Sequence, residues 1–328
     1  MKPVAIFLVS GGLDSLLAAA VMREHVSAGY MLHFQNPFEA VDSLEYMEEA
    51  AEKLSFPLVI EPLGNDYLEI VKNPRHGYGK NLNPCLDCRI LQFKKAVEFL
   101  KRKNADFIVT GEVLGQRPMS QNLRAMKLIE EESGAGGLIF RPLSARFLPP
   151  PDIIKSGAIS LDSFPKIKGR SRKMQIELAK EYGINKYEPP AGGCLLTMKE
   201  YSRKLSELFN KSSLPTPIEL TLLKIGRHFR ISPENKLIVG RNQNENELLE
   251  RIAPPDYTVI RPLENKGPTS IIDSLPCKKL LFTAAGISAR YTDSQEDEKI
   301  RFIYYNGKVS GEISSTAFSI TQTEEYRI

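Results

Sequence analysis

The sequence has few cysteines and no long apolar run. Four cysteines among 328 residues do not make a disulfide framework, and a chain of this length can bury a core without one. No apolar run approaches the roughly 18 residues of a membrane span, and the apolar N-terminal stretch is too short for a signal peptide. No residue type dominates and no short period recurs, which excludes collagen-like, coiled-coil and disordered classes. We therefore expect a globular cytoplasmic protein without a membrane partner.

The net charge of +4 hides an uneven distribution of charge along the chain. Residues 1–74 carry 4 basic and 11 acidic side chains, residues 75–211 carry 25 and 14, and residues 212–328 carry 15 of each. No acid lies between Asp162 and Glu177. That interval holds the densest basic run, formed by Lys166, Lys168, Arg170, Arg172 and Lys173. Such a run fits the phosphates of RNA, and it fits a solvated loop equally well.

Short apolar runs alternate with amphipathic stretches over the first two hundred residues. We expect strands at 4–9, 29–34, 57–60 and 105–110, and helices at 15–23, 42–54, 90–103 and 174–182. This alternation predicts an α/β fold with a parallel, doubly wound sheet. A Pro- and Ser-rich stretch at 212–217 resembles a linker. Beyond it, strand-like runs at 237–240, 257–260 and 301–305 and a helix at 278–291 predict a smaller α+β domain. We therefore expect domains at 1–211 and 218–328.

The segment Ser10-Gly11-Gly12-Leu13-Asp14-Ser15 lies between the first expected strand and the first expected helix. Its glycines allow a tight turn that exposes backbone N–H groups, its serines add hydroxyl donors, and the helix N-terminus favours anions. The segment therefore predicts a phosphate site, although it is neither a Walker loop nor a GxGxxG turn. In a doubly wound sheet the nucleotide lies at the carboxyl ends of the strands, so we expect adenine near His33 and Phe34. A lone histidine such as His33 is more often a packing residue.

The pattern SGGxDS resembles the PP-loop ATP pyrophosphatases, which have the adenine nucleotide alpha hydrolase-like fold. The resemblance implies that the whole segment from Ser10 to Ser15 binds the pyrophosphate end of ATP with Mg²⁺. It also implies that Asp14 helps to hold the metal or the phosphates, and that the substrate is activated by adenylation.

Three cysteines lie in contexts that favour metal or sulfur chemistry. Cys85 and Cys88 form a CxxC pair before a basic helix, and Cys194 follows the glycines of a turn at 191–193. A CxxC pair alone fits redox, zinc or iron–sulfur chemistry. Three thiolates leave one iron of a cluster open, whereas structural zinc normally takes four ligands. Cys277 lies beyond the expected linker, and we interpret it as an ordinary buried or surface cysteine.

Together these motifs resemble the tRNA thiolation branch of the PP-loop enzymes. The stretch TGEVLGQRPMSQ at 110–121 and the Arg-Pro-Leu at 141–143 are similar to the catalytic core of tRNA 4-thiouridine synthetase. The NPCxxC context is similar to the tRNA 2-thiouridylases. The resemblance covers about residues 4–200, and it adds Gly111 and Gln116 to the implied nucleotide-binding residues. A short stretch at 237–246 resembles the RNA-binding domain of NFACT proteins.

The resemblance implies an ATP-dependent tRNA sulfurtransferase that adenylates a uridine and replaces its carbonyl oxygen with sulfur. It favours 4-thiouridine over 2-thiouridine as the product. Asp14, Cys88 and Cys194 would be catalytic, and the five cations of the basic run would hold tRNA. Sulfur would come from a cysteine desulfurase or from inorganic sulfide, and a second copy of the chain could complete a homodimer.

Two routes for the sulfur stay open. Cys85, Cys88 and Cys194 could ligate a [4Fe-4S] cluster whose open iron carries sulfide, or Cys194 could carry a persulfide that a CxxC cysteine resolves. Three cysteines favour the cluster, since the persulfide route needs two. An alternative function is a PP-loop ligase or amidase that acts on a small molecule and binds structural zinc. A further alternative is an inactive RNA-binding protein with a degenerate loop.

Overall fold

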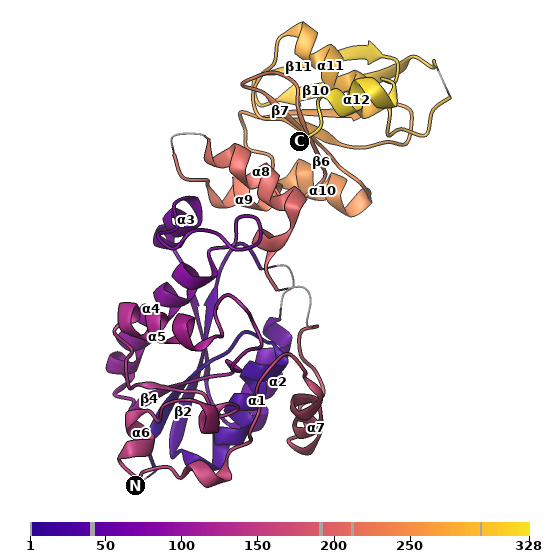
Figure 1. Ribbon diagram of the computed structural model, residues 1–328. Coiled ribbons are helices and arrows are strands. Elements are labelled where there is room, and N and C mark those ends of the chain that lie inside the picture. The colour runs from indigo at the N-terminus through magenta and orange to yellow at the C-terminus, as the bar shows by residue number, and fades with distance from the viewer. Residues whose placement is uncertain (1, 40–42, 190–192, 211–212, 296) are drawn as a thin grey trace. The chain divides into compact units, whose positions relative to one another are not determined.

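The computed structural model describes residues 2–39, 43–189, 193–210, 213–295 and 297–328. The chain forms two compact units, Met1–Lys199 and Glu200–Ile328 (Figure 1). Most of helix α8 (Lys199–Phe209) therefore falls in the second unit, whereas we expected the first domain to extend to residue 211. The expected linker at 212–217 begins outside the described residues, and its last residue starts helix α9 (Pro217–Leu222).

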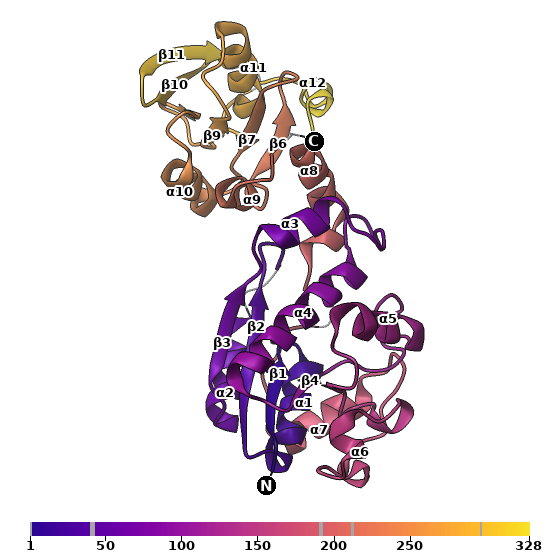
Figure 2. The ribbon, with the colours of Figure 1, turned by 90° about the vertical axis from the view of Figure 1, so that its left-hand side faces the viewer.

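The first unit contains a five-stranded parallel sheet, as expected for a doubly wound α/β fold. The strand order is β3-β2-β1-β4-β5, and Figure 2 shows β3, β2, β1 and β4 side by side. The strands are β1 (Val4–Leu8), β2 (Ala28–Gln35), β3 (Leu58–Pro62), β4 (Phe107–Thr110) and β5 (Ile139–Phe140). The first four match the strands predicted from the apolar runs, because each run is buried between helices.

Helices cover both faces of this sheet. They are α1 (Leu13–Met22), α2 (Leu44–Leu54), α3 (Asn65–Lys72), α4 (Cys85–Lys103), α5 (Leu123–Ser133), α6 (Asp152–Lys155) and α7 (Lys173–Glu181). Figure 1 shows α4 and α5 on one face and α1, α2 and α7 on the other. Leu13, Leu16 and Leu17 of α1 are fully buried in the same hydrophobic cluster as Phe7 of β1, so the helix that follows the first strand is part of the core. Among the described residues, no helix combines the length and the apolar character that a membrane crossing needs.

The start of α4 differs from the expectation. We predicted a helix from residue 90, whereas α4 begins at Cys85, directly after Pro84. Asp87 lies in the first turn, where a carboxylate interacts favourably with the helix dipole. The CxxC pair therefore lies within the first turns of the helix and does not precede it. The start of the helix expected at 42–54 lies in part outside the described residues, and α2 begins at Leu44.

The second unit is a six-stranded antiparallel sheet with helices, in agreement with the expected smaller α+β domain. The strand order is β11-β10-β8-β9-β7-β6. Its strands are β6 (Arg227–Arg230), β7 (Lys236–Val239), β8 (Thr258–Pro262), β9 (Ser270–Ile272), β10 (Ile300–Asn306) and β11 (Val309–Ser315). Besides α8 and α9, its helices are α10 (Gln243–Ile252), α11 (Lys278–Ala289) and α12 (Ile320–Glu325). The predicted strands correspond to β7, β8 and β10, and the predicted helix to α11.

Candidate functional site

A cavity of about 440 Å³ lies in the first unit at the carboxyl ends of β1, β2 and β4. This is the edge where doubly wound sheets bind their ligands. Its lining brings together Ser10, Gly12, Asp14, Ser15, His33, Phe34, Gly111, Glu112, Cys85, Cys88 and Cys194. The proposed phosphate loop, the proposed adenine position and all three candidate sulfur ligands thus share one cavity.

The phosphate loop has a backbone that only glycine permits at its second position. Gly11 has φ +72°, and a Cβ there would overlap the side chain of Ser43. The Ser10 N–H donates to Oγ of Ser15 at 3.2 Å, and the Ser15 hydroxyl donates to the Gly12 carbonyl at 2.8 Å. Gly12 precedes α1 as its N-cap residue without a side-chain cap. The Ser15 N–H donates to the Gly12 carbonyl at 3.1 Å, which leaves the N–H groups of Leu13 and Asp14 at the start of α1 for an anion.

Gly11 and Leu13 offer no side chain to the cavity, so any contact of theirs with a nucleotide would come from their backbone. Leu13 is fully buried in the core, so its side chain points away from the cavity. Gly11 and Leu13 are not among the cavity's lining residues. Gly111 does line the cavity, and a Cβ at that position would overlap the backbone of Asp14. The glycine of the TGE segment therefore allows the end of β4 to pass directly beside the phosphate loop.

Asp14 is held by side chains from two distant segments. Nε2 of Gln116 donates to its Oδ2 at 2.5 Å, and a guanidinium nitrogen of Arg172 lies 3.6 Å from the same oxygen. Burial raises the pKa of Asp14, and the Arg172 charge and the Gln116 hydrogen bond oppose that shift. Oδ1 of Asp14 is buried and has no hydrogen-bond partner among the described residues. An unsatisfied carboxylate oxygen beside a phosphate loop suits a divalent cation, so the residues present fit Mg²⁺.

Gln116 and Arg172, which we expected to bind the nucleotide and RNA respectively, both contact Asp14. Gln116 does not line the cavity and reaches it through Asp14. Arg172 lines the cavity, whereas the basic run predicts an RNA-binding role for it. The other four cations of the basic run, namely Lys166, Lys168, Arg170 and Lys173, are exposed. Nζ of Lys168 lies 4.6 Å from the centre of the Phe147 ring, which fixes part of this surface.

His33 and Phe34 lie at the end of β2 in the cavity wall, where adenine was expected. Both are buried, with 6% and 5% of their surface exposed. Nδ1 of His33 is 3.1 Å from the Val9 carbonyl oxygen, and its Nε2 is 3.6 Å from Oε1 of Glu39. These contacts hold the imidazole in place in the cavity wall.

The three candidate ligand cysteines come from two segments. Cys85 and Cys88 lie in the first turns of α4, and Cys194 precedes a short turn whose Leu195 N–H donates to the Phe38 carbonyl at 2.8 Å. Asn81 joins the two segments, because its Nδ2 donates to the Thr197 carbonyl at 2.7 Å. Residues 191 and 192 of the glycine turn lie outside the described residues. Cys277 is exposed at the N-cap of α11, in the second unit.

Burial raises the pKa of all three cysteine thiols. It raises the pKa of Cys88 to about 12 and that of Cys194 to about 11. Among the described residues, no group of three or more His, Cys, Asp or Glu side chains has the arrangement that would hold a metal ion. The three thiols share one cavity and are of the donor type that iron–sulfur clusters use, but they are not arranged around a common metal position.

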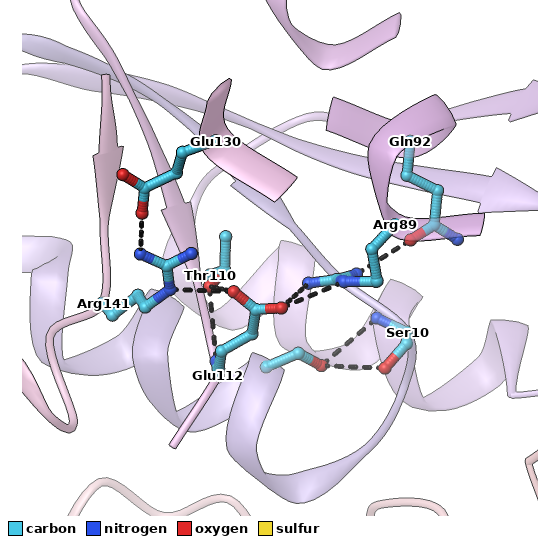
Figure 3. A network of polar contacts seen from close by, with 8 residues as sticks. Ser10, Arg89, Gln92, Thr110, Glu112, Glu130 and Arg141 are labelled. Atoms are coloured by element: carbon cyan, nitrogen blue, oxygen red, sulfur yellow. Dashed lines mark hydrogen bonds and ion pairs between the residues drawn. The ribbon is translucent and has the colours of Figure 1, made fainter. Parts of the chain in front are cut away.

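A buried ion-pair network connects α4 to the ends of β4 and β5 (Figure 3). Glu112 accepts hydrogen bonds from Arg89 at 2.9 Å and from Arg141 at 2.8 Å, and Arg141 also pairs with Glu130. Burial alone would raise the pKa of Glu112, but the two guanidinium groups lower it to about 2. Arg89 directly follows Cys88. The network therefore fixes the start of α4 relative to the cavity.

Sequence reasoning missed several residues of the cavity wall. Arg117 lies within the quoted motif at 110–121, so the motif itself could have drawn attention to its charge. Tyr67 lies on α3, a helix that the apolar pattern did not predict, and no motif contains it. The cavity-facing position of Arg172 was also missed, because a dense basic run gives no sign of which side chain turns inward.

Comparison with known families supports both parts of the expected resemblance. Residues 2–147 match the family described as thiamine biosynthesis protein (ThiI). Residues 226–327 match the family described as NFACT protein RNA binding domain. The second match extends the short resemblance seen at 237–246 over nearly the whole second unit.

Two curated proteins and one solved structure are among those that the chain matches. A probable tRNA sulfurtransferase of Methanocaldococcus jannaschii is 30% identical over 138 residues, which are 42% of this chain and 35% of that protein. A tRNA-specific 2-thiouridylase of Desulfosudis oleivorans is 26% identical over 114 residues, 34% of this chain and 32% of that protein. A crystal structure of a 4-thiouridine synthetase–RNA complex with bound ATP has 19% identity and a TM-score of 0.37, and the match covers 56% of this chain and 52% of that one.

The chain thus matches about a third of the length of these curated relatives. The matched residues include the phosphate loop, the CxxC pair and the TGE segment. In its first unit the chain therefore resembles the tRNA thiolation branch of the PP-loop enzymes, and in its second unit it resembles an NFACT RNA-binding domain.

Proposed function

We propose that this chain is an ATP-dependent tRNA sulfurtransferase that adenylates a uridine and replaces its carbonyl oxygen with sulfur. The observation that carries the proposal is the single cavity shared by the phosphate loop and three cysteines. An ATP site alone would fit many ligases. Thiols in the same cavity give the adenylated substrate a sulfur nucleophile within reach.

Adenylation would use the residues at the carboxyl edge of the sheet. The pyrophosphate end of ATP would bind the N-terminus of α1 and the hydroxyls of Ser10 and Ser15. Asp14 would hold Mg²⁺ through its unsatisfied oxygen, and Arg172 would add positive charge beside the phosphates. The uridine carbonyl oxygen then attacks the α-phosphorus and pyrophosphate leaves. The target base must be turned out of its stack to reach the buried cavity.

Sulfur transfer would use the cysteine side of the cavity. A sulfur nucleophile attacks the activated carbon of the base, and AMP leaves with the former carbonyl oxygen. We propose that Cys85, Cys88 and Cys194 hold a [4Fe-4S] cluster, which when bound would supply an open iron for a sulfide. The persulfide route on Cys194 is the alternative, and it needs a desulfurase as donor. We favour 4-thiouridine as the product because of the match at 110–121.

The test uses the full chain, ATP, Mg²⁺, sulfide and unmodified tRNA. We expect tRNA-dependent release of pyrophosphate and a thiolated nucleoside in the mass spectrum of the digested tRNA. Iron and acid-labile sulfide are measured in the same protein after anaerobic purification. A colourless, iron-free protein that still thiolates tRNA would exclude the cluster. Pyrophosphate release with a small acid and without tRNA would favour the small-molecule ligase.

A further inference from the structure

Tyr67 places a phenol hydroxyl among the three cysteines of the cavity. It lies on α3, only 2% of its surface is exposed, and it lines the cavity with Cys85, Cys88 and Cys194. The thiol of Cys88 donates to its hydroxyl oxygen over 3.7 Å, a distance typical of a hydrogen bond from sulfur. Burial raises the pKa of Tyr67, and the three cysteines add to this shift.

The ring of Tyr67 is held independently of its hydroxyl. It packs against the ring of Phe38, with the centroids 5.8 Å apart and the planes inclined at 58°. The Phe38 carbonyl in turn accepts the Leu195 N–H, next to Cys194. A phenylalanine at position 67 would keep the ring contact and lose only the polar group. Core packing alone therefore does not explain why a tyrosine, with a hydroxyl that needs a partner when buried, stands here.

We propose that Tyr67 is a positioning residue for the sulfur chemistry of this cavity, with its hydroxyl holding the sulfur of Cys88 in the cavity wall. The inference rests on the proposed function. A phenol can both accept and donate one hydrogen bond. It accepts from the Cys88 thiol, and it donates to the same sulfur once the thiol proton has left, as when the sulfur binds iron or attacks another sulfur. Hydrogen bonds to ligating sulfurs orient them and tune their reactivity.

The first test measures the hydrogen bond itself in the metal-free full chain. The infrared S–H stretching band of Cys88 is assigned by its loss in Cys88→Ser. We expect this band at lowered wavenumber in the unaltered chain, and we expect Tyr67→Phe to shift it upward. The matched control is Tyr78→Phe, because the Tyr78 hydroxyl donates to the Val71 and Lys72 carbonyls at the end of the same helix. A Cys88 band without the low-wavenumber shift in the unaltered chain would overturn the proposal, even if Tyr67→Phe did not fold.

The second test separates the two half-reactions. Tyr67→Phe should release pyrophosphate from ATP and tRNA at the rate of the unaltered chain. Its formation of thiolated nucleoside should fall by roughly tenfold to a hundredfold, the range that a hydrogen bond to a charged group supports. Equal losses in both steps would indicate a structural role and overturn the assignment, and so would an unchanged thiolation rate. Failure of the unaltered chain to thiolate tRNA would instead refute the proposed function, while the infrared result would still stand.

Discussion

At the scale of single residues, Asp14 is the loop side chain whose chemistry the structure defines most closely. One carboxylate oxygen is held by Gln116 and Arg172, and the other is buried without a partner among the described residues. We predict that Asp14→Ala lowers tRNA-dependent pyrophosphate release by at least about a hundredfold, because the charge that orients the cation and phosphates is lost. Asp66→Ala is the control, since Asp66 pairs with Lys95 at the surface. Release near the unaltered rate would contradict the assignment.

Cys194 allows the two chemical steps to be distinguished. It lies in the cavity but not in the phosphate loop, so it is not needed for attack on the α-phosphorus. We predict that Cys194→Ala retains pyrophosphate release and abolishes formation of the thiolated nucleoside. Both are measured on the same reaction, with Cys277→Ala in the second unit as the control. Parallel loss of the two products would instead indicate that Cys194 supports the fold of the site.

The same residues show what the sequence could and could not predict. The loop from Ser10 to Ser15 could be recognised as a phosphate site because its glycines, its hydroxyl groups and the start of the helix all lie within one short segment. Arg172 and Tyr67 reach the cavity from distant segments, and only the tertiary packing of α7 and α3 brings them there. Nothing in the local pattern around either residue indicates an inward direction.

At the scale of elements, the position of α4 depends on the buried carboxylate of Glu112. Glu112 is 3% exposed and pairs with Arg89 of α4 and with Arg141. Replacing it by glutamine leaves Arg89 without its carboxylate partner and leaves Arg141 with Glu130 alone. We predict that Glu112→Gln lowers the free energy of unfolding by about 3–5 kcal/mol, the usual cost of breaking a buried pair. Denaturant unfolding measures this free energy. The control is Glu131→Gln, which breaks the exposed ion pair with Lys127 and should change the free energy of unfolding little. An equal effect of the two substitutions would contradict the role of the network.

The same carboxylate predicts how stability depends on pH. The pKa of Glu112 is lowered from 4.5 to about 2 in the folded chain. The ionised carboxylate therefore stabilises the folded chain, and the full stabilisation is present at pH values above the pKa of glutamate in the unfolded chain. This stabilisation is lost as the pH falls toward 2. We therefore predict that the stability difference between the unaltered chain and Glu112→Gln shrinks as the pH falls from about 5 to about 2. The measurement is denaturant unfolding at a series of pH values. A difference that stays constant would show that the pKa of Glu112 is not lowered.

The boundaries of the helices and strands also show which elements can be predicted from local sequence patterns. The parallel strands were predictable because buried runs of apolar residues leave a clear signal. The start of α4 was not, because Cys85 and Cys88 do not continue the apolar period, and the helix begins there through Pro84 and Asp87. The short strands β5 and β9 have too few residues to show any period.

At the scale of the whole molecule, the net charge of +4 is the sum of an acidic first segment, a basic middle and a neutral remainder. The structure divides the basic run further, because Arg172 lines the cavity while Lys166, Arg170 and Lys173 are exposed. The run therefore has one member available to the nucleotide and others available to a polyanion outside the cavity. Charge counting along the sequence could not separate these two roles.

The exposed part of the run leads to a prediction about tRNA binding. We expect the triple variant Lys166→Gln, Arg170→Gln, Lys173→Gln to bind tRNA more weakly. Its log affinity should also fall less steeply with log salt, by about 0.7–0.9 for each phosphate that the variant no longer neutralises. Filter binding across a salt series measures the slope.

The control is the double variant Lys127→Gln, Lys155→Gln, because both exposed lysines already pair with acids. An unchanged slope in the triple variant would assign the run to a solvated surface. Pyrophosphate release at saturating tRNA should persist, because these three side chains lie outside the cavity lining.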